Sequence, residues 1–227
     1  MDYQRPQPAR VYPSRWEEND AVALRTVPFL RGPALPWSDW AMRPSAIALL
    51  VEEMKRGRES VVELGSGVST IVLARAAREL GARFVSIEHD AAWTKEVRGL
   101  LERERLDATR VVHVPLAELE PDALAVPSEP MLRAPASWYR LGALCEACPG
   151  EIELLVVDGP PAAESPDVLI RAPAVPALED RLAEECTVAL DDASRRAERH
   201  TAELWGRTLG CELELPAGTD LAILRRP

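Results

Sequence analysis

The residues with the clearest capacity for chemistry lie in the segment Glu63-Leu64-Gly65-Ser66-Gly67-Val68-Ser69-Thr70. A short apolar run ends in this glycine-rich turn, and an amphipathic helical pattern follows it. Gly65 and Gly67 carry no side chain, so a ligand can approach the backbone closely where strand turns into helix. Glu88 ends the next predicted strand, 21 residues after Gly67, where its carboxylate can accept hydrogen bonds from both hydroxyls of a ribose. The segment therefore predicts a site for a ribose-containing cofactor.

Two classes of cofactor bind at such a turn. Nicotinamide dinucleotides favour a third glycine at position 70, where this chain has Thr70. S-adenosylmethionine is cationic in its methionine half, which suits the carboxylate of Glu63, whereas a pyrophosphate would be repelled by it. The turn thus favours S-adenosylmethionine. The alternative is a purely structural turn beside a solvated Glu88.

Three aspartates form a second group. Asp158 follows one predicted apolar strand, and Asp191 and Asp192 follow the next. Neighbouring parallel strands lie about 4.8 Å apart, so these carboxylates can converge on one point. Three oxygens with open positions suit an octahedral Mg²⁺ that also grips a substrate hydroxylate. The sequence thus predicts a magnesium site here; alternatively, Asp192 or Ser194 caps the following helix and Asp158 lies in a turn beside the cofactor.

The elements that position these residues alternate between strand and helix from residue 45 onward. Strands are predicted at 60–64, 83–87, 110–114, 152–157 and 187–190, and helices at 45–56, 68–80, 91–106, 175–185 and 194–209. Segments 211–215 and 221–224 predict a closing antiparallel hairpin. This alternation predicts an α/β fold with a mainly parallel sheet, helices on both faces and ligands at the carboxyl ends of the strands.

Residues 1–44 have a different composition. They hold seven of the twenty prolines and six of the eleven aromatic residues, with no sustained period of 2 or 3.6. We expect a Pro/aromatic-rich N-terminal arm or lid, followed by the cofactor-binding domain over residues 45–227. Its Trp37 and Trp40, with Trp138 and Tyr139 from a second Pro-rich stretch, are expected to anchor the arm by burial. Alternatively, they stack on a flat substrate and close over the cofactor.

Composition excludes several classes of function. The 227 residues carry a net charge of −10, which opposes a role dominated by phosphate backbones, so nucleic acid is not an expected partner. No apolar run approaches the ~20 residues that cross a bilayer, and the N-terminus lacks a secretory signal pattern, so we expect a cytoplasmic protein without membrane partners. The four cysteines have no histidine near their single Cys-x-x-Cys pair, which favours free thiols.

Over about residues 45–227 the sequence resembles the class I S-adenosylmethionine-dependent methyltransferases. The resemblance rests on ELGSGVST at 63–70, SIEHD at 86–90, VVDGPP at 156–161, LDDAS at 190–194 and the terminal hairpin. It implies a Rossmann-like three-layer αβα sandwich with seven strands in the order 3-2-1-4-5-7-6 and an antiparallel last strand. Where the family usually has a third glycine this chain has Ser69, as in a subset that reads ELGSGxST.

The resemblance also implies roles for individual residues. Glu88 would hold the ribose hydroxyls, and His89 would lie beside the adenine or ribose. The residues expected to line the methionine and ribose are Glu63, Gly65, Ser66, Gly67 and Ser69, with Asp158 close to the cofactor. Metal-dependent O-methyltransferases of small phenols and sugars place aspartates at the same strand ends as Asp158, Asp191 and Asp192.

A general base is less clearly marked. Phenol-type enzymes carry a lysine shortly after the first metal aspartate and sugar-type enzymes an aspartate, whereas this chain has Pro160 and Pro161. The candidates near the cofactor edge are His89, His113 and Tyr139.

We therefore expect S-adenosylmethionine-dependent methyl transfer to a small molecule, with a hydroxyl as the acceptor group and Mg²⁺ as a second cofactor under the metal interpretation. The alternatives are a cofactor-binding protein or partner subunit without transfer activity, and a nicotinamide-dependent oxidoreductase. A homodimer stays open as the assembly.

Overall fold

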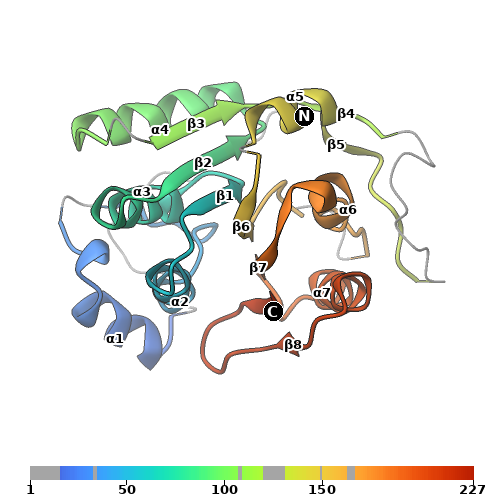
Figure 1. The fold of residues 1–227 in the computed structure, drawn as a ribbon. Coiled ribbons are helices and arrows are strands. Elements are labelled where there is room, and N and C mark those ends of the chain that lie inside the picture. Colours follow the sequence, from blue (N-terminus) through green and yellow to red (C-terminus); the bar gives the residue numbers. More distant parts are fainter. Residues whose placement is uncertain (1–15, 33–34, 107–108, 120–130, 149, 163–166) are drawn as a thin grey trace.

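The computed structural model describes residues 16–32, 35–106, 109–119, 131–148, 150–162 and 167–227. In this part of the chain a seven-stranded sheet lies between two layers of helices (Figure 1). Its strands, in spatial order, are β3 (Thr109–His113), β2 (Arg83–Glu88), β1 (Ser60–Leu64), β6 (Ile152–Val157), β7 (Leu182–Leu190), β9 (Ala222–Arg226) and β8 (Leu213–Glu214). Strand β9 runs antiparallel to β7 and β8. The expected α/β sandwich, its strand order and its C-terminal hairpin are confirmed.

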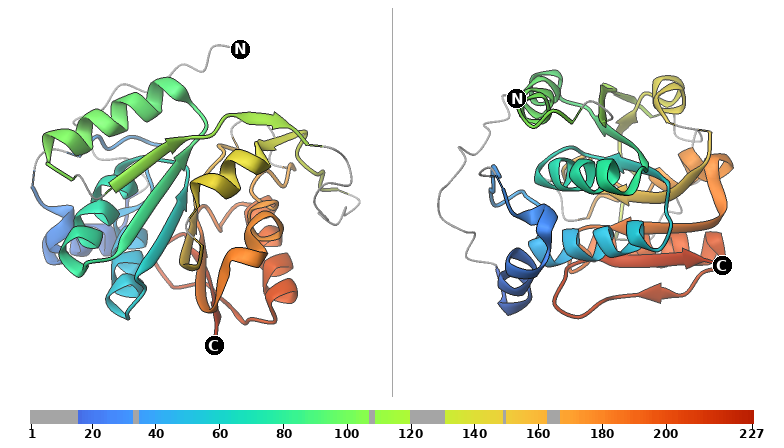
Figure 2. Two further views of the ribbon diagram at one scale, coloured as in Figure 1. Left: turned by 45° about the horizontal axis from the view of Figure 1, so that its top comes forward. Right: turned by 60° about the vertical axis from the view of Figure 1, so that its left-hand side comes forward.

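Helices cover both faces of the sheet, as Figures 1 and 2 show. One layer consists of α1 (Glu18–Thr26), α2 (Pro44–Lys55), α3 (Val68–Leu80) and α4 (Ala91–Arg103), and the other of α5 (Leu141–Ala147), α6 (Ala174–Leu178) and α7 (Arg196–Leu209). Side chains alternate between the two apolar cores along each strand, so Val61 packs into the first and Val62 into the second. A short pair, β4 (Leu116–Glu118) with β5 (Ser137–Tyr139), adds to the second layer.

The sequence-based boundaries are wrong at two places. The predicted helix over 175–185 ends at Leu178 and is followed by a 3₁₀ turn, Glu179–Arg181, because the residues from Leu182 onward pair with β6 and β9. Tertiary pairing overrides local propensity here. Helix α7 begins at Arg196, and its N-cap residue Arg195 makes no side-chain cap. The Ser194 hydroxyl donates to Asp220 instead, and neither Asp192 nor Ser194 is the N-cap residue of this helix.

The described part of the N-terminal segment packs into the first core. It forms α1 and a 3₁₀ turn (Pro28–Leu30), neither of which the sequence predicted, and buries Trp37 and Met42 against α2 and α3. Trp16 and Trp37 meet edge to face with ring centroids 5.0 Å apart. Trp138 and Tyr139 are also buried, whereas Trp40 is 45% exposed. Trp37 thus anchors the N-terminal segment by burial, as expected. The boundary at residue 44 between this segment and the cofactor-binding domain stays a prediction. Residues 1–15 and 33–34 lie outside the described residues.

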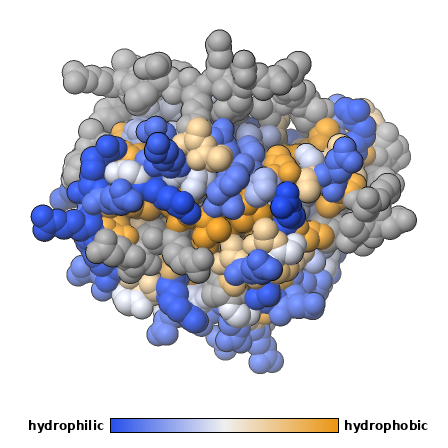
Figure 3. Space-filling model, turned by 90° about the horizontal axis from the view of Figure 1, so that it is seen from above, coloured by the Kyte–Doolittle hydropathy of each residue, from blue (hydrophilic) through white to orange (hydrophobic). Residues whose placement is uncertain are grey.

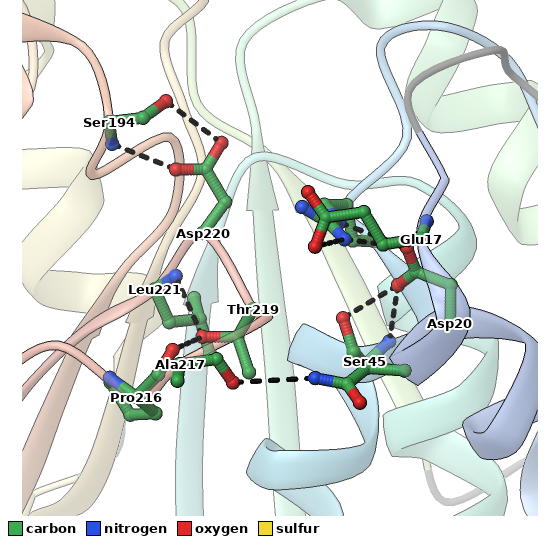
Figure 4. Close-up of polar contacts among 11 residues, drawn as sticks. Glu17, Asp20, Ser45, Ser194, Pro216, Ala217, Thr219, Asp220 and Leu221 are labelled. Carbon is green, nitrogen blue, oxygen red and sulfur yellow. Dashed lines mark hydrogen bonds and ion pairs between the residues drawn. The ribbon is translucent and has the colours of Figure 1, made fainter.

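Buried Asp20 joins this segment to α2 (Figure 4). Its Oδ1 accepts hydrogen bonds from the Ser45 amide at 3.0 Å and hydroxyl at 2.6 Å, and its Oδ2 lies 2.8 Å from Arg43 Nη2. Burial raises the pKa of Asp20, but the hydrogen bonds from Arg43 and Ser45 outweigh it, so the net shift is downward. On the other side of Figure 4, Ser194 donates its amide and hydroxyl to Asp220, which ties the start of α7 to the C-terminal hairpin.

The surface above α4 and α5 is shown in Figure 3. A band of apolar side chains crosses the middle of this view and hydrophilic side chains border it. Along helix α4, Val97 and Leu101 are buried against the core while Lys95 and Glu102 are exposed. Among the helices of the described residues, none has the length and apolar character needed to cross a membrane.

Asp20→Ala should lower the free energy of unfolding by about 3 kcal/mol, because it leaves Arg43 without its buried partner. Since the folded-state pKa of Asp20 is lowered, its stabilisation is present at neutral pH and fades as the pH falls. The difference in melting temperature between wild type and Asp20→Asn should narrow below pH about 4. Calorimetry over a pH series measures this, with Glu18→Gln, an exposed carboxylate of the same helix, as control. A constant difference down to acid pH would contradict the assignment.

Candidate active site

A cleft of about 660 Å³ lies at the carboxyl ends of the central strands. Its lining combines the turn after β1 (Gly65–Ser69), the residues after β2 (Glu88–Asp90), Trp93 of α4, Asp158 and Gly159 after β6, Arg171 shortly before α6, Asp192 and Arg195 after β7, and Ser38–Met42 of the N-terminal segment. Most of the predicted site residues therefore share one cavity.

The turns after β1 and β6 touch through their backbones. Gly65 has a positive φ of +90°, and a Cβ atom there would lie 2.7 Å from the amide nitrogen of Gly159. A Cβ atom on Gly159 would in turn lie 2.7 Å from Gly65 Cα. Only glycine fits at both positions. At Gly67, by contrast, an added Cβ would meet no atom within 4 Å, so the backbone there faces open space.

Glu63 lies behind the turn and not in the cleft. It is fully buried, and its Oε2 accepts hydrogen bonds from Thr70 Oγ1 at 2.5 Å and Ser86 Oγ at 2.6 Å. Thr70 Oγ1 also accepts the Gly67 amide at 2.8 Å. Burial raises the pKa of Glu63 to about 7, assisted by the charge of Glu88 and opposed by hydroxyl hydrogen bonds. Glu63 was predicted to line the cofactor site, but its carboxylate lies behind the turn and holds it in place through Thr70.

Glu88 faces the cleft from the end of β2. Its Oε2 accepts the Ser66 amide at 3.0 Å, its Oε1 accepts the Asp90 amide at 2.8 Å, and His89 Nδ1 lies 2.8 Å from the same Oε1. Trp93 lines the cleft beside them and donates its indole N–H to Ser66 O at 2.6 Å. Sequence reasoning missed Trp93, although its place in the first turn of the helix after Glu88 could have marked it.

The three predicted base candidates differ in their access to the cleft. His89 lines it. His113 instead lines a groove beside α4 and lies with Nε2 3.0 Å from His89 O. Tyr139 is buried below the cleft, 6.4 Å from the His89 ring, and burial, reinforced by the charge of Glu88, raises its pKa well above the usual value. Of these three, only His89 therefore lines the cleft.

The three aspartates do converge: one oxygen from each of Asp158, Asp191 and Asp192 lies within 4.8 Å of the others. Arg171, which the sequence analysis did not consider, lies among them. Its Nη2 is 3.1 Å from Asp158 Oδ1 and 3.0 Å from Asp192 Oδ2, and its Nη1 donates to the Asp191 carbonyl at 2.9 Å. Arg195 Nη1 lies 2.7 Å from Asp192 Oδ2. Asp192 has a positive φ of 61°, a conformation that aspartate tolerates better than most residues.

Charge within this cluster is compensated by protein groups. Burial raises the pKa of Asp158 to about 7, with Arg171 acting in the opposite direction, and burial together with the charge of Asp158 raises the pKa of Asp191 well above its usual value. Asp191 also hydrogen bonds to Asp158. The guanidinium of Arg171, which is always charged, contacts two of the three carboxylates that a divalent cation would need as ligands, those of Asp158 and Asp192. The residues as arranged do not fit the predicted Mg²⁺ site.

Comparisons with known proteins agree with this fold. A family model described as a methyltransferase domain matches residues 62–193, more than half of the chain. No curated protein matches the sequence.

Three solved structures share the fold at low sequence identity. The S-adenosylhomocysteine-bound methyltransferase PaMTH1 of Podospora anserina has a TM-score of 0.58 and 12% identity, covering 92% of this chain and 86% of its own. Precorrin-6y C5,15-methyltransferase of Geobacter metallireducens has a TM-score of 0.54 and 13% identity, covering 83% and 90%. An O-methyltransferase of Bacillus cereus in complex with S-adenosylhomocysteine has a TM-score of 0.52 and 14% identity, covering 92% and 90%.

The family match includes the glycine-rich turn, Glu88, Asp158 and Asp192, all of which line the cleft. This chain is a member of the class I S-adenosylmethionine-dependent methyltransferases, with S-adenosylmethionine as its cofactor.

Proposed function

We propose that the protein transfers the methyl group of S-adenosylmethionine to a hydroxyl of a small molecule. The observation that carries the proposal is that a cofactor-type turn, Glu88 and the partly exposed carboxylate of Asp158 line one cleft. A small acceptor agrees with the cleft volume of about 660 Å³ and with the net charge of −10.

The cofactor would lie along the ends of β1 and β2. Gly67 offers backbone without a side chain, Glu88 would hold the ribose hydroxyls, and Trp93 and His89 would flank the nucleoside. When bound, the cofactor supplies a methyl group on a positively charged sulfur. Glu63 would act from behind the turn, by fixing Gly67 through Thr70.

The acceptor would then approach from the ends of β6 and β7. Asp158 is the group there that suits a general base, because its side chain is 17% exposed and its pKa is raised to about 7. Asp158 would accept the proton of the acceptor hydroxyl, and the hydroxyl oxygen would take the methyl group that the bound cofactor supplies. The products are the methyl ether and S-adenosylhomocysteine. Trp40, exposed on the rim, would contact the acceptor.

Glu88→Ala should weaken binding of S-adenosylhomocysteine by roughly 1.5 to 3 kcal/mol, the size expected for charge-assisted hydrogen bonds. Titration calorimetry gives the value, and Glu102→Ala, an exposed carboxylate on α4 outside the cleft, is the matched control. NAD is titrated in parallel. Tight NAD binding without any response to S-adenosylmethionine would refute the cofactor site.

Asp158→Asn should lower turnover by about 10² to 10⁴ while changing S-adenosylhomocysteine affinity only a few-fold. A base works in its deprotonated form, so wild-type turnover should fall about tenfold per pH unit below the raised pKa of Asp158, about 7. Methyl transfer from radiolabelled S-adenosylmethionine to catechol, a phenolic acid and a monosaccharide measures this.

Two other outcomes of that assay would decide against the proposal. Cofactor binding with no transfer to any of these hydroxyls, or to other small hydroxylated molecules, favours a binding protein without transfer activity. Unchanged turnover in Asp158→Asn would show that Asp158 is not the general base and would leave His89 as the candidate.

A further inference from the structure

We propose that Arg171 is the fixed cation of the acceptor end of the cleft and takes the place that a divalent metal ion holds in metal-dependent methyltransferases. The inference rests on the proposed function in one respect, because it takes the ends of β6 and β7 to be where the acceptor binds. It goes further by assigning the carboxylate cluster to a metal-independent reaction and by naming the residue responsible.

The first argument is geometric. The guanidinium of Arg171 is placed as a bridging cation would be, with one nitrogen, Nη2, 3.1 Å from Asp158 and 3.0 Å from Asp192. These contacts join the ends of β6 and β7, the two strands that a metal would bridge. A second nitrogen, Nη1, is held by the carbonyl of Asp191. The position of the charge is therefore set from three sides.

The second argument is that Arg171 is built into the fold. Its side chain is only 3% exposed, and the next residue, Ala172, is buried and accepts the indole N–H of Trp205 at 2.9 Å. Buried Glu198 of α7 also faces the guanidinium, whose charge counteracts the effect of burial on that carboxyl. A metal ion that expelled Arg171 would have to bury the arginine elsewhere or expose it, and would leave Glu198 without this cation.

The third argument is the balance of charge. Two arginines, Arg171 and Arg195, contact Asp158 and Asp192. Each of these two carboxylates therefore already has a guanidinium beside it. A divalent cation placed among them would lie close to these positive charges in a poorly solvated region, which is unfavourable unless an arginine leaves.

This arrangement gives Arg171 two effects on the reaction. Its charge favours the ionised form of Asp158, which keeps the carboxylate available as a base near neutral pH. Its Nη2 also donates to both Asp158 and Asp192, which fixes the direction of these two side chains at the cleft wall. Arg171 is therefore a positioning residue, and methyl transfer should need no added divalent ion.

The test is metal binding to the whole protein, measured without reference to turnover. Wild type, Arg171→Gln and the control Arg199→Gln, an exposed arginine of α7, are titrated with MnCl₂ and the free Mn²⁺ is followed by electron paramagnetic resonance. Melting temperatures are recorded with and without MgCl₂ or MnCl₂. S-adenosylhomocysteine affinity is measured for the same proteins, because it reports on the proposed function separately.

We expect wild type and Arg199→Gln to bind no Mn²⁺ at this cluster and to melt at the same temperature with and without metal. Arg171→Gln leaves the three carboxylates without their central cation and should gain a Mn²⁺ site. Its melting temperature should rise by about 5 °C or more at a metal concentration about a hundredfold above the dissociation constant. A merely structural role for Arg171 would create no such site.

Two results would overturn the inference. One is Mn²⁺ binding to wild type that disappears in Asp191→Asn, which would show a true metal site; the other is a folded Arg171→Gln that binds no Mn²⁺. If Arg171→Gln does not fold, the double variant Arg171→Gln/Asp192→Asn removes one negative charge with the positive one and should fold. Failure of the double variant to fold would also contradict the claim that the charge of Arg171 balances the charges of these carboxylates. Loss of S-adenosylhomocysteine binding in wild type would instead refute the proposed function.

Discussion

The negative charge of carboxylates at the buried ends of parallel strands must be balanced by hydrogen-bond donors, cations or protons. The site depends on which of these this chain provides. The strand order places Glu63, Asp158 and Asp191 at one edge of the sheet, where little water reaches them. Glu63 accepts hydrogen bonds from two hydroxyl groups and has a raised pKa, whereas the carboxylate of Asp158 lies against the guanidinium of Arg171. The first solution fixes the cofactor turn, and the second leaves a charged group at the cleft wall that can accept a proton.

The turn after β1, which Glu63 holds, and the turn after β6, which carries Asp158, contact each other through their backbones. Gly65 and Gly159 are packed so closely that neither position accommodates a side chain, and this contact holds the cofactor turn of β1 against the turn that carries Asp158. Under the proposed function, this main-chain packing would set the distance between the cofactor and the acceptor, and it is more rigid than a contact between side chains. Methyl transfer needs such fixed alignment, because the acceptor oxygen must approach the methyl carbon in line with the breaking bond.

The sequence predicted the parts of this structure that local pattern controls. Apolar strands, amphipathic helices and the turn at 63–70 follow from periodicity and glycine placement, and the strand order followed from a family resemblance. The start of β7 was missed because residues 182–185 become strand only through pairing with neighbours. Arg171 was missed because it lies in an irregular segment and reaches the aspartates only in the folded chain. A cluster of acidic residues predicts a cation, but it does not predict that an arginine supplies it.

The central claim is that this cleft binds a methyl donor beside an arginine-compensated carboxylate cluster. Crystals grown with S-adenosylhomocysteine and MnCl₂, with diffraction recorded at the manganese absorption edge, test it most directly. The account predicts the nucleoside along Gly65–Ser69 with its ribose at Glu88, Arg171 between Asp158 and Asp192, and no anomalous peak among the aspartates. A manganese peak there with Arg171 turned away, or the nucleoside bound outside the cleft, would contradict the account.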